Sequence, residues 1–134
     1  MRMLFVNLPV KDLTASMAFW RQLGLDFNQE YTDDSAACLV LDDNIFAMLL
    51  TEARFRDFIN GEIADAHATT EVLTCLTCSS REEVDDLVAK AVAAGGKPWK
   101  PAIDVGADVG PMHGGSFQDP DGHVWELMSM EAPA

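Results

Sequence analysis

The amino-acid sequence predicts an α+β fold of paired βαβββ modules, whose curved mixed sheets form a cup with the helices outside and a cavity inside. Two observations lead to this prediction. The order strand, helix, strand, strand, strand occurs twice along the 134 residues, with little side-chain identity between the two copies. Each expected helix also begins at a capping residue, Asp12 or one of Ser79 and Ser80, and ends at a glycine, Gly24 or Gly95.

The first module is expected at residues 1–52 of a single domain that spans residues 1–134. It opens with a strand from Met3 to Val10. A helix follows from Leu13 to Leu23, because the apolar residues of this segment fall mostly at helical spacing. Three shorter strands complete the module, at Asp26–Tyr31, Ala36–Leu41 and Ile45–Thr51.

Residues 53–68 are expected to connect the modules, with a short helix near Arg54–Ile59, and the second module occupies residues 69–134. Its first strand is expected at Glu71–Cys78. The helix that follows has an apolar stripe of Val84, Leu87, Val88, Ala91 and Val92. Strands are then expected at Lys97–Val105, Met112–Gln118 and His123–Met130, with a loop at Val105–Pro111.

The chain is strongly acidic, with 22 Asp and Glu residues against 9 Lys and Arg residues and a net charge of −13. Phosphate backbones and anionic membrane surfaces bind through Lys and Arg, so neither nucleic acid nor a membrane is an expected partner. No apolar stretch approaches the ~20 residues of a membrane span, and the N-terminal apolar run is too short for a signal peptide. We therefore expect a cytoplasmic protein whose negative field attracts cationic compounds.

The 3 cysteines do not suggest a disulfide framework, because their number is odd. Cys75 and Cys78 have CxxC spacing, but they lie in an expected strand, where their thiols would point to opposite faces. No second CxxC is present to complete a zinc site. By default we interpret these cysteines as small, buried side chains of apolar character.

The stretch Ser116–Glu126 holds the strongest functional candidate. Asp119-Pro-Asp-Gly122 is typical of a tight turn, and an apolar strand follows it. In that strand Glu126 shares a face with Val124 and Met128. A carboxylate on an apolar face must be solvated in a cavity, paired, bound to a cation or kept protonated. The alternative is an exposed glutamate on a solvent-facing side of the strand.

Parts of the chain resemble the vicinal oxygen chelate superfamily, which includes glyoxalase I, extradiol dioxygenases and bleomycin-resistance proteins. The segments that carry the resemblance are Leu8-Pro-Val-Lys-Asp-Leu13, Ala18–Leu25 and Phe117–Leu127. The resemblance covers nearly the whole chain and implies the paired βαβββ fold, a small organic molecule as partner, and a homodimer. Sheet edges and an open cup also favour a dimer, because unpaired edges must be covered.

The resemblance further implies metal-ligand positions on the first and last strands of each module, which fall at Phe5, Met48, Leu73 and Glu126. Only Glu126 can bind a hard divalent cation, because Phe5 and Leu73 offer no donor and a thioether is soft. Glu71 is the one acidic residue near these positions that could add a ligand. We therefore predict no cofactor; a divalent metal held by Glu126 is the disfavoured alternative.

Glu126 and His113 are the candidate catalytic residues. A desolvated Glu126 could act as a general acid or base near neutral pH or anchor a cationic ligand, and the alternative is a carboxylate hydrogen-bonded to nearby backbone. His113 precedes two glycines that let a ligand approach, and the alternative is an ordinary surface histidine. The expected cavity wall comprises Phe5, Asn7, Met48, Leu50, Leu73, Trp99, Phe117 and Glu126.

Two further histidines and two tryptophans are expected outside this site. His123 has the opposite strand parity to Glu126 and should pack outside or cap the turn, and His67 should be exposed. Trp20 and Trp125 are expected in the core between helix and sheet.

Three functional hypotheses follow. The first is a metal-free binding or sequestering protein of the bleomycin-resistance type for a small organic molecule, with cationic compounds favoured by the net charge. The second is an enzyme of the glyoxalase or dioxygenase type with a metal held by Glu126. The third is a metal-free lyase, isomerase or hydrolase-like enzyme that uses Glu126 as a general base.

Overall fold

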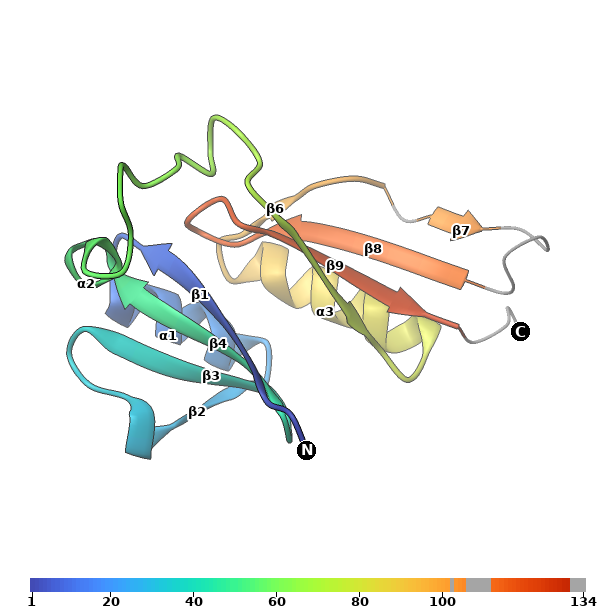
Figure 1. Ribbon diagram of the computed structural model, residues 1–134. Coiled ribbons are helices and arrows are strands. Elements are labelled where there is room, and N and C mark those ends of the chain that lie inside the picture. Colours follow the sequence, from blue (N-terminus) through green and yellow to red (C-terminus); the bar gives the residue numbers. More distant parts are fainter. Residues whose placement is uncertain (102, 106–111, 131–134) are drawn as a thin grey trace. The chain divides into compact units, whose positions relative to one another are not determined.

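The computed structural model describes residues 1–101, 103–105 and 112–130 (Figure 1). Two compact units divide the chain, Met1–Ala64 and Asp65–Ala134, and each is described by itself. Each unit has the order strand, helix and further strands that the sequence predicts. The α+β fold of two βαβββ modules is therefore confirmed, while the cup shared by both sheets stays a prediction.

The helix of the first module begins at Leu13 as predicted and ends one residue earlier than predicted, at Gln22 instead of Leu23. The elements of this module are β1 (Leu4–Val10), α1 (Leu13–Gln22), β2 (Asp26–Asn28), β3 (Ala36–Asp42), β4 (Ile45–Thr51) and α2 (Glu52–Arg56). Asp12 caps α1, because its Oδ1 accepts the Ala15 N–H at 3.0 Å. The expected strand Asp26–Tyr31 is too long, since Gln29–Tyr31 forms a 3-10 helix that the Asn28 side chain caps.

The first sheet has the strand order β1-β4-β3-β2, with β1 and β4 parallel and the other pairs antiparallel. α1 covers one face of the sheet, where it contacts β3 and β4. Its core side chains are Leu8, Val10, Phe19, Trp20, Phe27, Ala37, Leu39, Ala47 and Leu49. The burial of Trp20 confirms its predicted place in the core. On the opposite face, α2 contacts β1 and β4, the 3-10 helix contacts β3, and Cys38, Phe46 and Leu50 are buried.

The second module repeats the pattern with one divided strand (Figure 1). Its elements are β5 (Leu73–Thr77), α3 (Arg81–Ala93), β6 (Lys97–Pro98), β7 (Ile103–Val105), β8 (Met112–Gln118) and β9 (Val124–Ser129). Ser80 caps α3, because its Oγ accepts the Glu83 N–H at 3.0 Å. The strand order is β5-β9-β8-β6, with β5 and β9 parallel, and β7 also pairs with β8.

The predicted continuous strand Lys97–Val105 is wrong, because β6 and β7 pair separately with β8. Pro101 lies between them and has no N–H to donate to a ladder. The Lys100 N–H instead donates to the Ser116 side-chain Oγ at 3.1 Å. Residues 106–111 of the expected loop lie outside the described residues.

α3 covers one face of the second sheet. A Cβ atom on Gly115 of β8 would lie 3.1 Å from methyl carbons of Val84 and Val88, so glycine here lets the helix pack closely. Phe117 and Trp125 are each 1% exposed on the same face, which confirms the predicted core position of Trp125. The predicted apolar stripe of α3 is too wide, since Val92 is 41% exposed.

None of the helices in the described part of the chain has the length and apolar character of a transmembrane segment.

Candidate functional site

Glu126 is the centre of a row of three side chains on the open face of the second sheet. Its paired neighbour on β5 is Cys75, and its paired neighbour on β8 is Ser116. Directly paired residues project to the same face of a sheet. The row therefore brings a thiol, a carboxylate and a hydroxyl group together on the face that α3 does not cover.

A pocket of about 190 Å³ lies over this row. Its lining is mainly apolar, with the three side chains of the row and Lys100 as the polar members. The lining residues are Cys75, Lys100, Pro101, Met112, Gly114, Gly115, Ser116, Glu126, Leu127 and Met128. Glu126 is half-buried in this wall, which favours the cavity interpretation of the carboxylate over that of a freely exposed one.

The three cysteines differ in environment. Cys38 is fully buried, as predicted for a small apolar residue, whereas Cys75 is exposed, which corrects that expectation. Although the Cys75 side chain is exposed, partial desolvation by its surroundings, and then the charge of Glu126, raises the pKa of its thiol above the ordinary value. Burial, followed by a hydrogen bond with Glu83, raises the pKa of the Cys78 thiol to about 12. Both thiols are therefore protonated at neutral pH.

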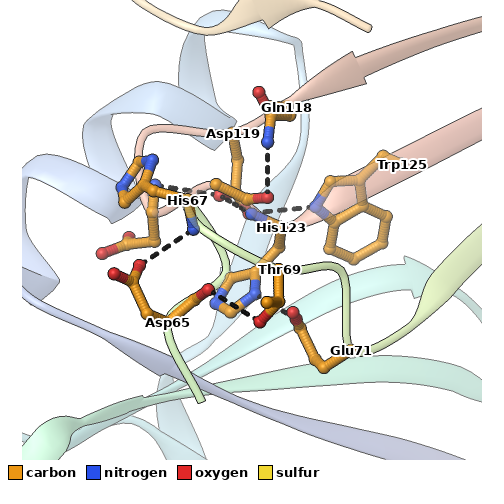
Figure 2. Close-up of polar contacts among 10 residues, drawn as sticks. Asp65, His67, Thr69, Glu71, Gln118, Asp119, His123 and Trp125 are labelled. Atoms are coloured by element: carbon orange, nitrogen blue, oxygen red, sulfur yellow. Dashed lines mark hydrogen bonds and ion pairs between the residues drawn. The ribbon is translucent and has the colours of Figure 1, made fainter. Parts of the chain in front are cut away.

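The turn before β9 is held by a buried carboxylate (Figure 2). Asp119 is 4% exposed, and its Oδ1 accepts the N–H groups of Asp121 at 3.0 Å and His123 at 3.1 Å. Its Oδ2 accepts the Trp125 Nε1–H at 3.0 Å. Burial raises the pKa of Asp119, although the charge of His123 and the Trp125 hydrogen bond act in the opposite direction.

His123 links this turn to the segment that precedes β5. It is 3% exposed, and its Nδ1 lies 2.8 Å from Glu71 Oε1, as Figure 2 shows. Gly122, at φ +87°, lies against the same segment, since a Cβ atom there would be 2.9 Å from backbone atoms of Ala66 and His67. These contacts join the starts of β5 and β9, the two strands that carry Cys75 and Glu126. The turn therefore positions the row.

The expected turn-capping place of His123 agrees with these contacts, and His67 is exposed, as predicted. The sequence did not reveal the buried role of Asp119, although an aspartate whose side chain accepts the N–H two residues on is a known turn signal. Glu71, considered above as an extra metal ligand, pairs with His123 instead.

The structure separates the two candidate catalytic residues. His113 on β8 has the opposite parity to Ser116, so it lies on the face that α3 covers rather than beside Glu126. It is 7% exposed, and its Nε2 lies 2.7 Å from Asp85 Oδ1 on α3. Phe117 lies on this covered face too, so neither residue lines the pocket over Glu126.

The predicted cavity residues of the first module come together on one face of their own sheet. Phe5 and Asn7 on β1, and Met48 and Leu50 on β4, share the face opposite α1. The Phe5 ring stacks on that of Phe46, with centroids 4.8 Å apart. Asn7 and Leu50, together with Phe55, Phe58 and Ile59, line a hollow of about 420 Å³ next to α2.

The two remaining predicted cavity residues lie in the second module. Leu73 is paired with Val124, on the same face as Glu126, and is 54% exposed. Trp99 is half-buried and donates its backbone N–H to the Ser116 carbonyl oxygen at 3.3 Å. The Lys100 ammonium nitrogen lies 5.9 Å from the centre of the Trp99 ring.

The side chains at the implied metal positions do not fit a hard divalent cation. Phe5 and Leu73 have no donor atom, Met48 has a soft thioether, and only Glu126 supplies an oxygen ligand. Within residues 1–101, 103–105 and 112–130, no group of three or more His, Cys, Asp or Glu side chains could hold a metal ion.

Comparisons with known proteins agree with this architecture. The sequence profile of the Glyoxalase/Bleomycin resistance protein/Dioxygenase superfamily matches residues 2–127. The chain belongs to this superfamily. No curated protein matches it.

Several solved structures have the same fold. A hypothetical protein from S. aureus is 25% identical, with a TM-score of 0.79 and coverage of 96% of this chain and 94% of that one. A glyoxalase/bleomycin resistance protein/dioxygenase family enzyme from Burkholderia phytofirmans PsJN is 18% identical, with a TM-score of 0.78 and coverage of 98% and 100%. A glyoxalase-related enzyme from Fulvimarina pelagi is 20% identical, with a TM-score of 0.76 and coverage of 96% and 88%.

Proposed function

We propose that this chain binds a small organic molecule in the pocket over Glu126, without a metal ion. The observation that carries the proposal is a half-buried carboxylate in the wall of a mainly apolar pocket of about 190 Å³. Such a carboxylate favours a ligand that brings a positive charge or a hydrogen-bond donor to it. The net charge of −13 supports the attraction of cationic compounds.

A metal-dependent lyase or dioxygenase is less well supported, because three of the four implied ligand positions carry Phe5, Met48 and Leu73. Elemental analysis of the purified protein separates the two functions. One Zn, Ni, Fe or Mn per chain, lost on substitution of Glu126, would contradict the metal-free proposal.

The substitution Glu126→Gln tests the proposal directly. Small amines and quaternary ammonium compounds are screened by thermal shift, and the affinities of the hits are measured by titration calorimetry. The variant keeps the side-chain shape but loses one charge-assisted hydrogen bond, so binding should weaken by about 1.5–3 kcal/mol. Its melting temperature should be unchanged or higher, because a desolvated charge is removed.

The matched control is Glu82→Gln, which removes the same charge from an exposed position on α3. If both variants weaken binding equally, net charge alone attracts the ligand. If Glu126→Gln lowers stability strongly and leaves every affinity intact, then Glu126 is structural and the proposal fails.

The functional unit is proposed to be a homodimer. β1 and β5 are the outer strands of their own sheets in the described strand orders, and both leave large apolar side chains exposed. On and beside these strands the exposed apolar residues are Met3, Leu4, Phe5, Val72 and Leu73. Covering them would satisfy the free edges. Light scattering at micromolar concentration should give twice the 14.6 kDa chain mass, and a monomer mass contradicts the proposal.

A further inference from the structure

The pocket over Glu126 contains a reactive group that the binding proposal does not use. Cys75 is exposed, lines this pocket, and is directly paired with Glu126 across the parallel strands β5 and β9. A thiol next to a carboxylate inside a pocket is an arrangement of a nucleophile and a general base.

The surroundings of Cys75 keep its thiol protonated. Partial desolvation and then the charge of Glu126 raise the pKa of this group. Because the thiolate is the reactive form, such a thiol reacts slowly with electrophiles in bulk solution. It becomes nucleophilic only when a nearby base takes its proton during the reaction. The same carboxylate that disfavours the free thiolate is the adjacent group that can accept this proton.

We propose that Cys75 adds covalently to an α,β-unsaturated carbonyl compound bound in the pocket, with Glu126 as the general base. This inference rests on the proposed binding of a small molecule at the same site. It differs from that proposal by naming a reaction and a class of substrate.

The step is balanced without an oxidant or a reductant. The sulfur lone pair forms a bond to the β-carbon, the carbon–carbon π electrons move to give an enolate, and the thiol proton passes to the Glu126 carboxylate. The same proton then returns to the α-carbon, which leaves a saturated thioether adduct and regenerates the carboxylate.

The remaining lining fits this substrate class. Met112, Leu127 and Met128 provide apolar contact for a carbon skeleton. Lys100 lines the same pocket, and its ammonium group suits a carbonyl oxygen that becomes an enolate oxygen. A conjugated ketone has both parts, an apolar body and one polarised oxygen.

The other cysteines provide internal controls. Cys38 is 0% exposed, and the half-buried Cys78 has a thiol pKa of about 12. Neither lines the pocket over Glu126, although the Cys78 thiol forms a hydrogen bond with Glu83. The structure therefore predicts modification at one cysteine of the three.

The test uses the full chain with 4-phenyl-3-buten-2-one as the probe, and its saturated counterpart 4-phenyl-2-butanone as the control. Intact-mass spectrometry follows adduct formation over time, and peptide mapping locates the adduct. The expected result is one adduct per chain at Cys75, none in Cys75→Ser, and none from the saturated ketone. Cys75 is exposed, so the serine variant should fold normally, which circular dichroism checks.

The variant Glu126→Gln decides between two causes of reactivity. If Glu126 acts as the base, the variant should form the adduct at least about tenfold more slowly, while Glu82→Gln reacts at the wild-type rate. If Cys75 reacts only as a free thiolate, removal of the neighbouring charge makes the variant faster. A faster Glu126→Gln, or an adduct mapped to Lys100 instead of Cys75, would overturn the inference.

The binding proposal is judged separately. An amine ligand that binds in a Glu126-dependent way, together with no adduct at Cys75, contradicts the covalent step and leaves the proposed function standing. If no amine binds but the adduct forms at Cys75 with the expected dependence on Glu126, the cationic ligand is wrong and the reaction stands.

Discussion

The two modules have the same framework but different chemistry at matched places. In the first sheet the row at the centre of the face opposite α1 is Asn7, Met48 and Cys38, and in the second sheet the row on the face opposite α3 is Cys75, Glu126 and Ser116. Met48 and Glu126 each lie four residues after the last residue of the preceding turn, Asn44 or Gly122. A thioether at one centre and a carboxylate at the other therefore distinguish two sheets with similar backbones.

The turns before β4 and β9 differ in the same way. Asp42 is exposed, and its carboxylate accepts the N–H of its neighbour Asp43 at 2.7 Å. Asp119 is buried and accepts three donors. With three donors to Asp119, the second module should hold its row in place more firmly than the first, which stability measurements can test.

The largest expected difference concerns these two aspartates. Asp119→Ala leaves three N–H groups without their acceptor, including the buried Trp125 Nε1–H, so the free energy of unfolding should fall by about 2–5 kcal/mol. Asp42→Ala should lower the free energy of unfolding by less than about 0.5 kcal/mol, because Asp42 is exposed. Urea unfolding followed by circular dichroism measures both.

An intermediate variant makes this comparison sharper. Asp119→Asn can keep the two backbone hydrogen bonds to Oδ1 but turns an NH₂ group toward the Trp125 Nε1–H. Its loss of stability should lie between those of Asp119→Ala and the wild type. Equal stabilities of Asp119→Ala and Asp42→Ala would show that the buried network does not hold the second module.

The next difference in size concerns two glycines with positive φ. A Cβ atom on Gly24, which follows α1 at φ +90°, would meet no other atom within 4 Å. At Gly122, at φ +87°, a Cβ atom would be 2.9 Å from backbone atoms of Ala66 and His67. Gly24→Ala should lower the free energy of unfolding by only about 1–2 kcal/mol, because alanine is strained in the left-handed conformation. Gly122→Ala should lower the free energy of unfolding by a further ~1–3 kcal/mol, because the backbone at Ala66 and His67 must move to make room for the Cβ atom.

Thermal or urea unfolding of the two alanine variants checks this ranking. Gly122→Ala should also weaken binding at the pocket over Glu126, since the turn positions β9. If Gly122→Ala is as stable as Gly24→Ala, the segment 65–71 moves at little energetic cost. That segment then does not fix the start of β5.

Local features of the structure were accessible from the sequence. The cap Asp12 and the strands Ile45–Thr51 and Met112–Gln118 lie where the sequence predicts them, and the second cap is Ser80, one of the two serines that the sequence allowed. These features depend on residues a few positions apart, so short windows contain the necessary information. The divided strand at β6 and β7 had a local signal as well, in Pro98 and Pro101, that the continuous-strand prediction overlooked.

The candidate site was predicted only in part. Glu126 was identified because its strand parity is a local property. The separation of His113 from Glu126 and the place of Cys75 beside it were not, because both depend on the register between strands. A shift of the pairing register by one residue would turn every side chain of the strand to the opposite face of the sheet. β5 and β9 are far apart in the chain, and no short motif encodes how they pair.

The order of the elements, the caps and turns, and the acidic residue at the centre of the second row follow from the amino-acid sequence alone. These follow from backbone preferences and side-chain periodicity, which act over one or two turns of chain. The folded modules alone show that Cys75 and Ser116 flank Glu126, that His113 faces Asp85, and that Glu71 pairs with His123. Such pairs form when distant strands and helices pack, so the free energy of the whole module selects them.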